Sequence, residues 1–110
     1  MAGKFVVKKA KNGQFMFNLK ASNGEIILTS EMYKAKSSAM NGIKSVKANA
    51  KAKKNFKTFT AKNGQPYFVL RAGNNQVIGT SEMYSSQSGM ENGIDSVKKN
   101  APGAKIDDLT

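Results

Sequence analysis

The chain has 110 residues, of which 39% are hydrophobic and 8% aromatic, and its formal net charge is +11. This length suits one compact domain, and the spread of apolar residues indicates a folded protein. The absence of cysteine and histidine excludes disulfides, thiolate catalysis, and the commonest zinc ligand and general base.

The sequence is one unit written twice. Ser30–Tyr33 reads Ser-Glu-Met-Tyr and returns as Ser81–Tyr84, and the rest of the unit returns at the same shift of 51 positions. A repeat of about 50 residues indicates two copies of one supersecondary unit, each too small to bury a core well alone. We therefore expect two modules, residues 1–52 and 53–110, within one compact domain.

The first module begins with three predicted strands. Residues 4–9 and 14–20 alternate apolar and polar side chains, which is the period of a half-buried antiparallel strand. Asn12-Gly13 between them and Asn23-Gly24 after them supply residues that tolerate a positive φ, as tight hairpin turns require. Residues 25–29 form the third predicted strand.

A helix is predicted after the strands of each module. Apolar residues fall at helical spacing at Ala39, Ile43, Val46 and Ala50, and at Met90, Ile94, Val97 and Ala101. Ser37 and Ser88 are the candidate N-caps. Gly42 and Gly93 lie on the apolar face, where glycine costs about 1 kcal/mol relative to alanine, so we expect the helix to approach the sheet closely there.

The second module repeats the same order from Phe56 onward, with strands near residues 67–70 and 76–80. Residues 105–109 predict a short closing strand after the second helix. We therefore expect an α+β fold. Two β-β-β-α(-β) repeats, related by a pseudo-twofold axis, would form one antiparallel sheet with both helices packed on one face.

Three motifs carry a family resemblance. Each half pairs Asn-Gly-Gln, Ser-Glu-Met-Tyr and Asn-Gly-Ile-x-Ser-Val-Lys, and this combination resembles the YegP-like family of small bacterial proteins. The resemblance implies a tandem repeat that forms a single sheet, with C-terminal strands exchanged between the repeats. The family is a domain of unknown function, so the resemblance carries over no catalytic residues.

The positive charge is concentrated in the first half of the chain. Residues 1–54 carry twelve lysines against two acids, a net +10, whereas residues 55–110 carry six cations against five acids, a net +1. Such a field attracts nucleic acid or another polyanion. The candidate binding residues are Lys8, Lys9, Lys11, Lys20, Lys51, Lys53 and Lys54, with Tyr67 and Arg71 on the outer sheet face. The alternatives are a solvated lysine-rich surface, and a protein-interaction or assembly module that uses the outer sheet face.

The two Ser-Glu-Met-Tyr segments are candidate sites for a small polar ligand. Their candidate residues are Ser30, Glu31, Tyr33, Ser81, Glu82 and Tyr84. The structural interpretation competes, since the carboxylate near a helix start and the tyrosine could simply close the end of the core.

No catalytic constellation is recognisable in the sequence. Ser96 and Lys99 match a Ser-x-x-Lys spacing without any companion motif, so we expect no enzyme, metal or cofactor. No stretch approaches the roughly 20 apolar residues of a membrane span, and residues 1–5 hold no signal-peptide core. We expect a cytoplasmic monomer, with a homodimer as the alternative, and nucleic acid or a protein as its partner.

Overall fold

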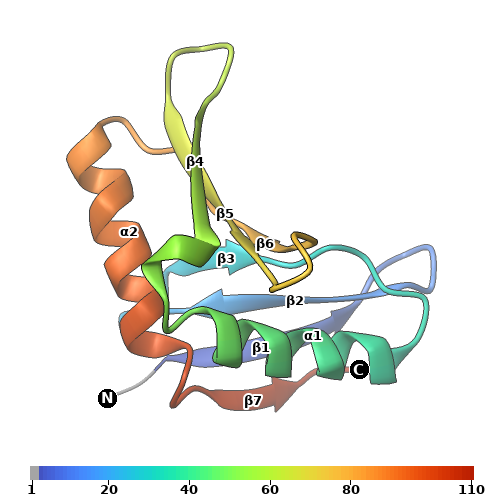
Figure 1. The fold of residues 1–110 in the computed structure, drawn as a ribbon. Coiled ribbons are helices and arrows are strands. Elements are labelled where there is room, and N and C mark those ends of the chain that lie inside the picture. The colour runs from blue at the N-terminus through green and yellow to red at the C-terminus, as the bar shows by residue number, and fades with distance from the viewer. Residues whose placement is uncertain (1–2) are drawn as a thin grey trace.

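The computed structural model describes residues 3–110, which fold into seven strands, two α-helices and one 3-10 turn (Figure 1). In chain order they are β1 (Lys4–Lys9), β2 (Phe15–Lys20), β3 (Ile26–Thr29), α1 (Lys36–Asn49), η1 (Lys53–Asn55), β4 (Phe56–Thr60), β5 (Pro66–Arg71), β6 (Val77–Thr80), α2 (Gln87–Asn100) and β7 (Lys105–Asp108). Every strand and helix expected from the sequence is present, within about two residues at its ends.

The strands form one sheet in the order β4-β5-β6-β3-β2-β1-β7, which confirms the α+β class and the single sheet. β7 follows the second repeat yet pairs with β1 of the first, so one of the two strand exchanges implied by the family resemblance is present (Figure 1). The matching residues of the first repeat, 54–57, lie in η1 and at the start of β4 instead. One pairing differs from the expected antiparallel sheet, because β7 runs parallel to β1. α2 connects β6 to β7 and carries the chain across the sheet to the edge strand β1. A long helical connection of this kind allows two strands to pair in parallel.

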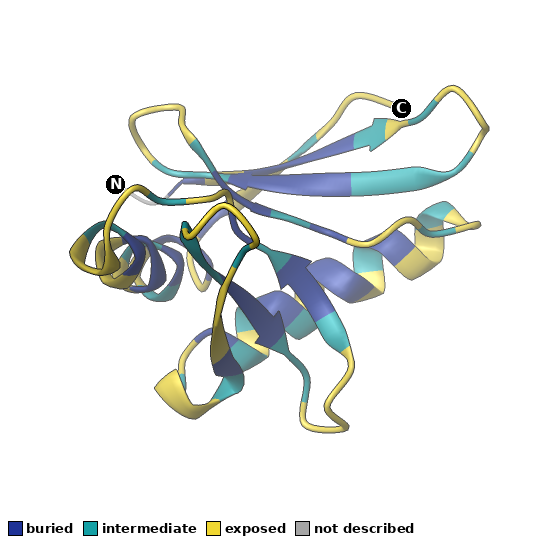
Figure 2. Cartoon of the chain, turned by 90° about the horizontal axis from the view of Figure 1, so that it is seen from above, coloured by how far each residue is buried: buried dark blue, intermediate teal, exposed yellow. Residues whose placement is uncertain are grey.

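Both helices pack on the same face of the sheet. α1 contacts β2 of its own repeat and β5 and β6 of the other, while α2 contacts β5 of its own repeat and β3 of the other. Beneath them, one buried cluster joins side chains of both repeats, including Phe5, Phe17 and Phe68, each fully buried. Figure 2 shows that the buried stretches lie along the strands and the helices, whereas the turns are exposed. Each repeat therefore completes its core with the helix of its partner repeat.

The seam between the repeats is thin. β3 and β6 share a single registered pair, Thr29 with Thr80. At this seam the duplicated positions have diverged: Leu28 matches Gly79 under the 51-residue shift. A Cβ added to Gly79 would lie 2.5 Å from the Leu28 Cδ2 atom, and Leu28 is only 1% exposed. The glycine therefore leaves the space that the leucine of the other repeat fills.

The helix caps differ from those expected. Ser37 and Ser88 lie inside the first turns, and Ala35 begins α1 without any side-chain cap. Ser86 caps α2, because its Oγ accepts a hydrogen bond from the Gly89 N–H at 3.0 Å. Several serines lie around the start of each helix, so the sequence left the N-cap position ambiguous, because each serine could cap a helix that begins at the next residue.

We predict that Gly79→Ala lowers the free energy of unfolding by about 1–3 kcal/mol through overpacking, and that Leu28→Ala lowers it by about 2–5 kcal/mol through a cavity. The double variant should lose less than the sum, because each change relieves the other. Urea unfolding measures all three. Gly73→Ala is the control, since a Cβ there meets nothing within 4 Å. Strict additivity of the two seam variants would contradict this packing.

Candidate functional site

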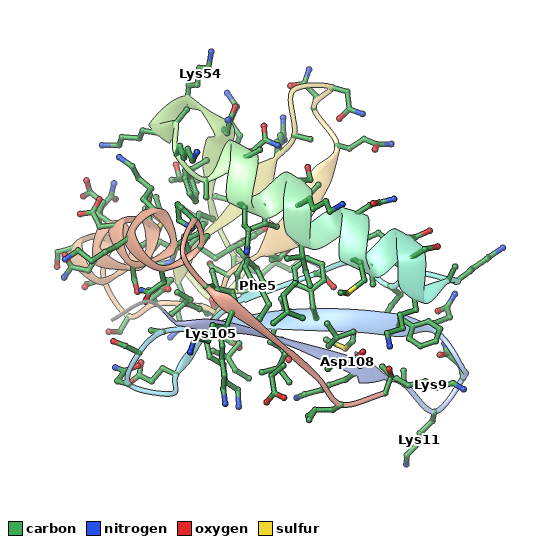
Figure 3. The ribbon with its side chains drawn as sticks, turned by 90° about the horizontal axis from the view of Figure 1, so that it is seen from below. Phe5, Lys9, Lys11, Lys54, Lys105 and Asp108 are labelled. Carbon is green, nitrogen blue, oxygen red and sulfur yellow. The ribbon has the colours of Figure 1, made fainter. Side chains whose placement is uncertain are left out.

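The lysines named from the sequence do not form one patch. Lys54 lies at one end of the molecule, and Lys9 and Lys11 lie at the other (Figure 3). The Lys9 Nζ atom lies 5.8 Å from the centroid of the Phe15 ring, which gives this lysine a local aromatic partner. Lys8 is partly buried in β1, and its registered pair with Met16 lies four pairs along the β1–β2 ladder from the pair that contains Lys20.

The lysines at the end of α1 have local explanations. Lys51 lines a depression beside Lys44, Lys47 and Pro102, at the C-terminal end of α1, where the helix dipole favours cations. Lys53 lines a small depression with Glu91 and Asp95 of α2, so acidic groups lie close to it. These lysines can stabilise the fold without any ligand.

A different set of lysines is brought together by the exchanged strand. Lys105 of β7, Lys4 of β1 and Lys20 of β2 are registered partners across three adjacent strands. Lys4 and Lys20 point to the face opposite the helices, since their strand neighbours Phe5 and Leu19 are fully buried beneath the helices. We call Lys105, Lys4 and Lys20 the lysine row.

Like charges on directly opposed strand positions repel one another, with Cβ atoms about 5 Å apart. Asp107 offsets part of this repulsion, because its carboxylate lies 3.7 Å from the Lys4 Nζ atom. Among the described residues the only other ion pair joins Lys36 and Asp108, on the opposite side of β7. Most of the cationic side chains that produce the net charge of +11 therefore form no ion pair within residues 3–110.

The lysine row borders a depression of about 480 Å³, lined by Gly3, Lys4, Ala21, Ser22, Gly24, Gly103 and Lys105. Glycine is required at position 3, because a Cβ there would lie 1.8 Å from the backbone oxygen of Lys20. This close approach brings β1 and the end of β2 together beside two ammonium groups and the Ser22 hydroxyl. The lining is mainly apolar, and Lys4 and Lys105 are its two charged residues.

The Lys36–Asp108 contact fixes the end of β7 against α1. Hydrogen bonds from Lys36, and then from Thr110, lower the pKa of Asp108 to about 2. The Leu109 N–H also donates to the Val7 carbonyl oxygen at 2.9 Å, which extends the pairing one residue beyond β7. These contacts keep Lys105 in register with Lys4.

The outer sheet face is less accessible than its alternating pattern suggests. Asn18 and Val69 have the strand phase of the outer face, yet they are only 4% and 7% exposed. Tyr67 stacks on Phe59 with ring centroids 5.6 Å apart, and Phe59 is 40% exposed. The Arg71 Nε atom is buried and has no hydrogen-bond partner among the described residues. An anion at Arg71 would supply one.

The Ser-Glu-Met-Tyr segments use their hydroxyls within the fold. The Ser30 Oγ atom accepts from the Phe17 N–H at 2.9 Å and donates to the Glu31 carbonyl at 2.8 Å. Ser81 makes the same pair of bonds with the Phe68 N–H and the Glu82 carbonyl, at 2.9 and 2.8 Å. Both serines are 8% exposed, whereas the side chains of Glu31 and Glu82 point into solvent. In these loops, which join β3 and β6 to the helices, both serine hydroxyls are therefore occupied by hydrogen bonds within the fold.

The tyrosines of these segments explain the glycines inside the helices. Tyr33 stacks on Phe17, and a Cβ on Gly42 would lie 2.6 Å from the Tyr33 Oη atom. In the second repeat, a Cβ on Gly93 would lie 2.1 Å from the Oη atom of Tyr84. The nearest neighbour at each glycine is therefore the loop tyrosine, and the expected approach to the sheet is present behind it, with the rings of Phe17 and Phe68 at 3.0 and 3.2 Å from the added Cβ.

The sequence pattern missed two members of the lysine row. Lys4 has the same strand phase as Lys8, so the alternation of β1 could have identified it. Lys105 carried no such signal, because its neighbours depend on a parallel pairing between residues about 100 positions apart in the chain.

Two further classes of site can be assessed within residues 3–110. No group of three or more acidic side chains gathers there as a metal cluster would require. No helix in this part of the chain has the length and apolar character needed to cross a membrane.

Comparisons with known proteins agree with the repeat architecture. The family described as "Domain of unknown function (DUF1508)" matches residues 10–56 and again residues 61–108. A UPF0339 protein of Pseudomonas aeruginosa is 55% identical over 108 residues, covering 98% of each chain. The UPF0339 protein YegP of Yersinia pestis is 56% identical over 108 residues, covering 98% of this chain and 96% of its own.

Solved structures share the fold. The solution NMR structure of a UPF0339 protein from Shewanella oneidensis has a TM-score of 0.94 at 52% identity, covering 100% of this chain and 93% of its own. The solution NMR structure of YegP from E. coli, described as a protein of unknown function, has a TM-score of 0.95 at 47% identity. Its alignment covers 100% of this chain and 95% of its own.

The loop tyrosines predict a pH dependence of stability. Burial, and then Glu31, raises the pKa of Tyr33 above its usual 10.0. Burial, followed by Glu82 and Glu25, does the same for the pKa of Tyr84. The folded chain thus holds these protons more tightly than the unfolded chain. This stability is fully present below the unfolded pKa and is lost as the pH rises through the folded pKa.

Urea unfolding between about pH 9 and pH 11.5 tests this contribution. The free energy of unfolding should fall with pH more steeply in the natural chain than in a Tyr33→Phe/Tyr84→Phe variant, which lacks both of these phenol groups. Equal pH slopes in the two proteins would contradict the assignment.

Proposed function

We propose that this chain, which belongs to the DUF1508 family of uncharacterised proteins, is a non-enzymatic cytoplasmic protein that binds anionic polymers, with nucleic acid as the favoured partner. The register of Lys105, Lys4 and Lys20 is the observation that carries this proposal. Three cations are held side by side, and a single carboxylate offsets them, 3.7 Å from Lys4. A bound phosphodiester would relieve the repulsion that the fold imposes on them.

The depression beside the lysine row suits a phosphate group. Lys4, Lys105 and Ser22 are among its lining residues, and Gly3, Gly24 and Gly103 contribute no side chains to it. Ammonium, hydroxyl and backbone donors make the positioning contacts to a nucleic-acid backbone, and they read no base edges. We therefore propose binding with little sequence preference.

The rest of the charge distribution supports the same partner. Besides Lys4 and Lys20, ten further lysines in residues 1–54 add to the positive potential of the molecule, which raises the local concentration of a polyanion before contact. Lys44, Lys47 and Lys51 form a second cluster, but the helix dipole already accounts for its position. The lysine row lacks such an internal explanation, so we assign the primary contact to it.

Fluorescence anisotropy with a 20-nucleotide single-stranded DNA, and with its duplex, tests this assignment. We predict that a Lys4→Ser/Lys20→Ser/Lys105→Ser variant binds at least about tenfold more weakly at about 0.15 M salt. Its slope of log K against log salt on the duplex should be shallower by about 3, since each lost phosphate contact removes about 0.9.

The matched control is Lys44→Ser/Lys51→Ser/Lys62→Ser, which removes the same charge from exposed positions elsewhere. We expect it to weaken binding by less than about threefold, through the general field alone. Equal losses of affinity in the two variants would mean that the lysine row acts only through its share of the net charge. The absence of binding by the natural chain at about 0.15 M salt would overturn the proposed function.

A further inference from the structure

The two edges of the sheet are equivalent under the repeat, but only one of them is covered by a further strand. Under the 51-residue shift, β1 matches β4. The outer edge of β1 is covered by β7, and the Val7 carbonyl accepts a hydrogen bond from the Leu109 N–H at 2.9 Å. β4 forms the other edge, and no strand of the described chain lies beyond it (Figure 1).

The connection between the repeats explains this difference. The residues that match β7 in the first repeat are 54–57, and they are used to complete η1 and to begin β4 itself. The chain therefore has no segment left to cover β4. Thr58 matches Val7, so its backbone N–H and carbonyl face outward where Val7 meets the β7 segment. β4 is an exposed edge of the kind that pairs with another chain.

We propose that the open edge of β4 docks an extended acidic segment of a partner protein, which adds to the sheet as an eighth strand parallel to β4. The occupant of the equivalent edge provides the template. β7 carries Asp107 and Asp108 and pairs in parallel with β1, where Lys4 and Lys36 are their ionic partners. Strand addition of this type derives its affinity from backbone hydrogen bonds and its selectivity from alternate side chains.

The residues around β4 define the segment that fits. Lys57 is exposed and matches Val6, the registered partner of Asp107, so an acidic residue of the added strand would lie beside its ammonium group. On the helix side, Thr58, Phe59, Thr60, Pro66, Gln87 and Met90 line a depression of about 140 Å³. Gln87 matches Lys36, the partner of Asp108. The next residue of the segment would therefore be polar and reach the Gln87 amide.

Charge favours such a partner over a second copy of this chain. Each copy carries +11, so two copies repel, and a lysine on an edge strand, here Lys57 at the second position of β4, is a common protection against pairing of edges. An acidic strand converts the same lysine into an attractive contact. This docking edge goes beyond the proposed polyanion binding, because β4 and the lysine row lie at opposite ends of the strand order.

The probe is a synthetic peptide with the sequence of residues 103–110, Gly-Ala-Lys-Ile-Asp-Asp-Leu-Thr, added to the full isotope-labelled chain. We expect saturable binding, with NMR shifts and slowed amide exchange centred on Phe56, Thr58 and Thr60. A peptide with both aspartates replaced by asparagine should bind about fivefold more weakly, as expected for the loss of an exposed ion pair.

Lys57→Glu should weaken binding of the acidic peptide by at least about fivefold, whereas Lys62→Glu, in the neighbouring turn, should change it by less than about twofold. NMR on the natural chain keeps the test independent of whether a variant folds. Shifts centred on Phe5 and Val7, which would mean displacement of β7, would overturn the proposal. The absence of any NMR shift at millimolar peptide would also overturn it. The same holds if amide exchange at β4 is already slowed without peptide, through self-association of the chain.

Discussion

The pairing of β7 with β1 is the contact on which the rest of the molecule depends. A unit of about 50 residues buries too little apolar surface to be stable alone, and here the two units share a single registered ladder pair at Thr29 and Thr80. The exchanged strand and the two helices, each of which packs on strands of both repeats, supply the remaining connections. Two repeats that would not be stable alone thereby form one domain with one core.

The same exchange makes the duplicated halves unequal. On one edge, β7 brings Lys105 into register with Lys4 and so creates the lysine row. On the other edge, the residues that match β7 are used in η1 and at the start of β4, so no strand of residues 3–110 covers the outer edge of β4. The charged surface and the open edge therefore have one cause, namely that the chain can exchange a strand in one direction only.

Local pattern predicted most of the fold and little of the site. The alternation in residues 4–9 and 14–20, the Asn-Gly turns and the helical spacing from Ala39 to Ala50 are properties of neighbours in the sequence, and they identified the elements. The lysine row depends on a parallel register between distant segments, which no local period encodes. The burial of Asn18 and Val69 on the face opposite the helices likewise depends on how the strands assemble.

The most direct test of the central claim follows the amide NMR signals of the natural chain as a short single-stranded DNA is added at about 0.15 M salt. The account predicts that the largest shifts fall on Gly3, Lys4, Ser22 and Lys105, around the depression of about 480 Å³. Small shifts spread evenly over all exposed lysines, or shifts centred on Lys44 and Lys51 of the first helix and its end, would contradict it.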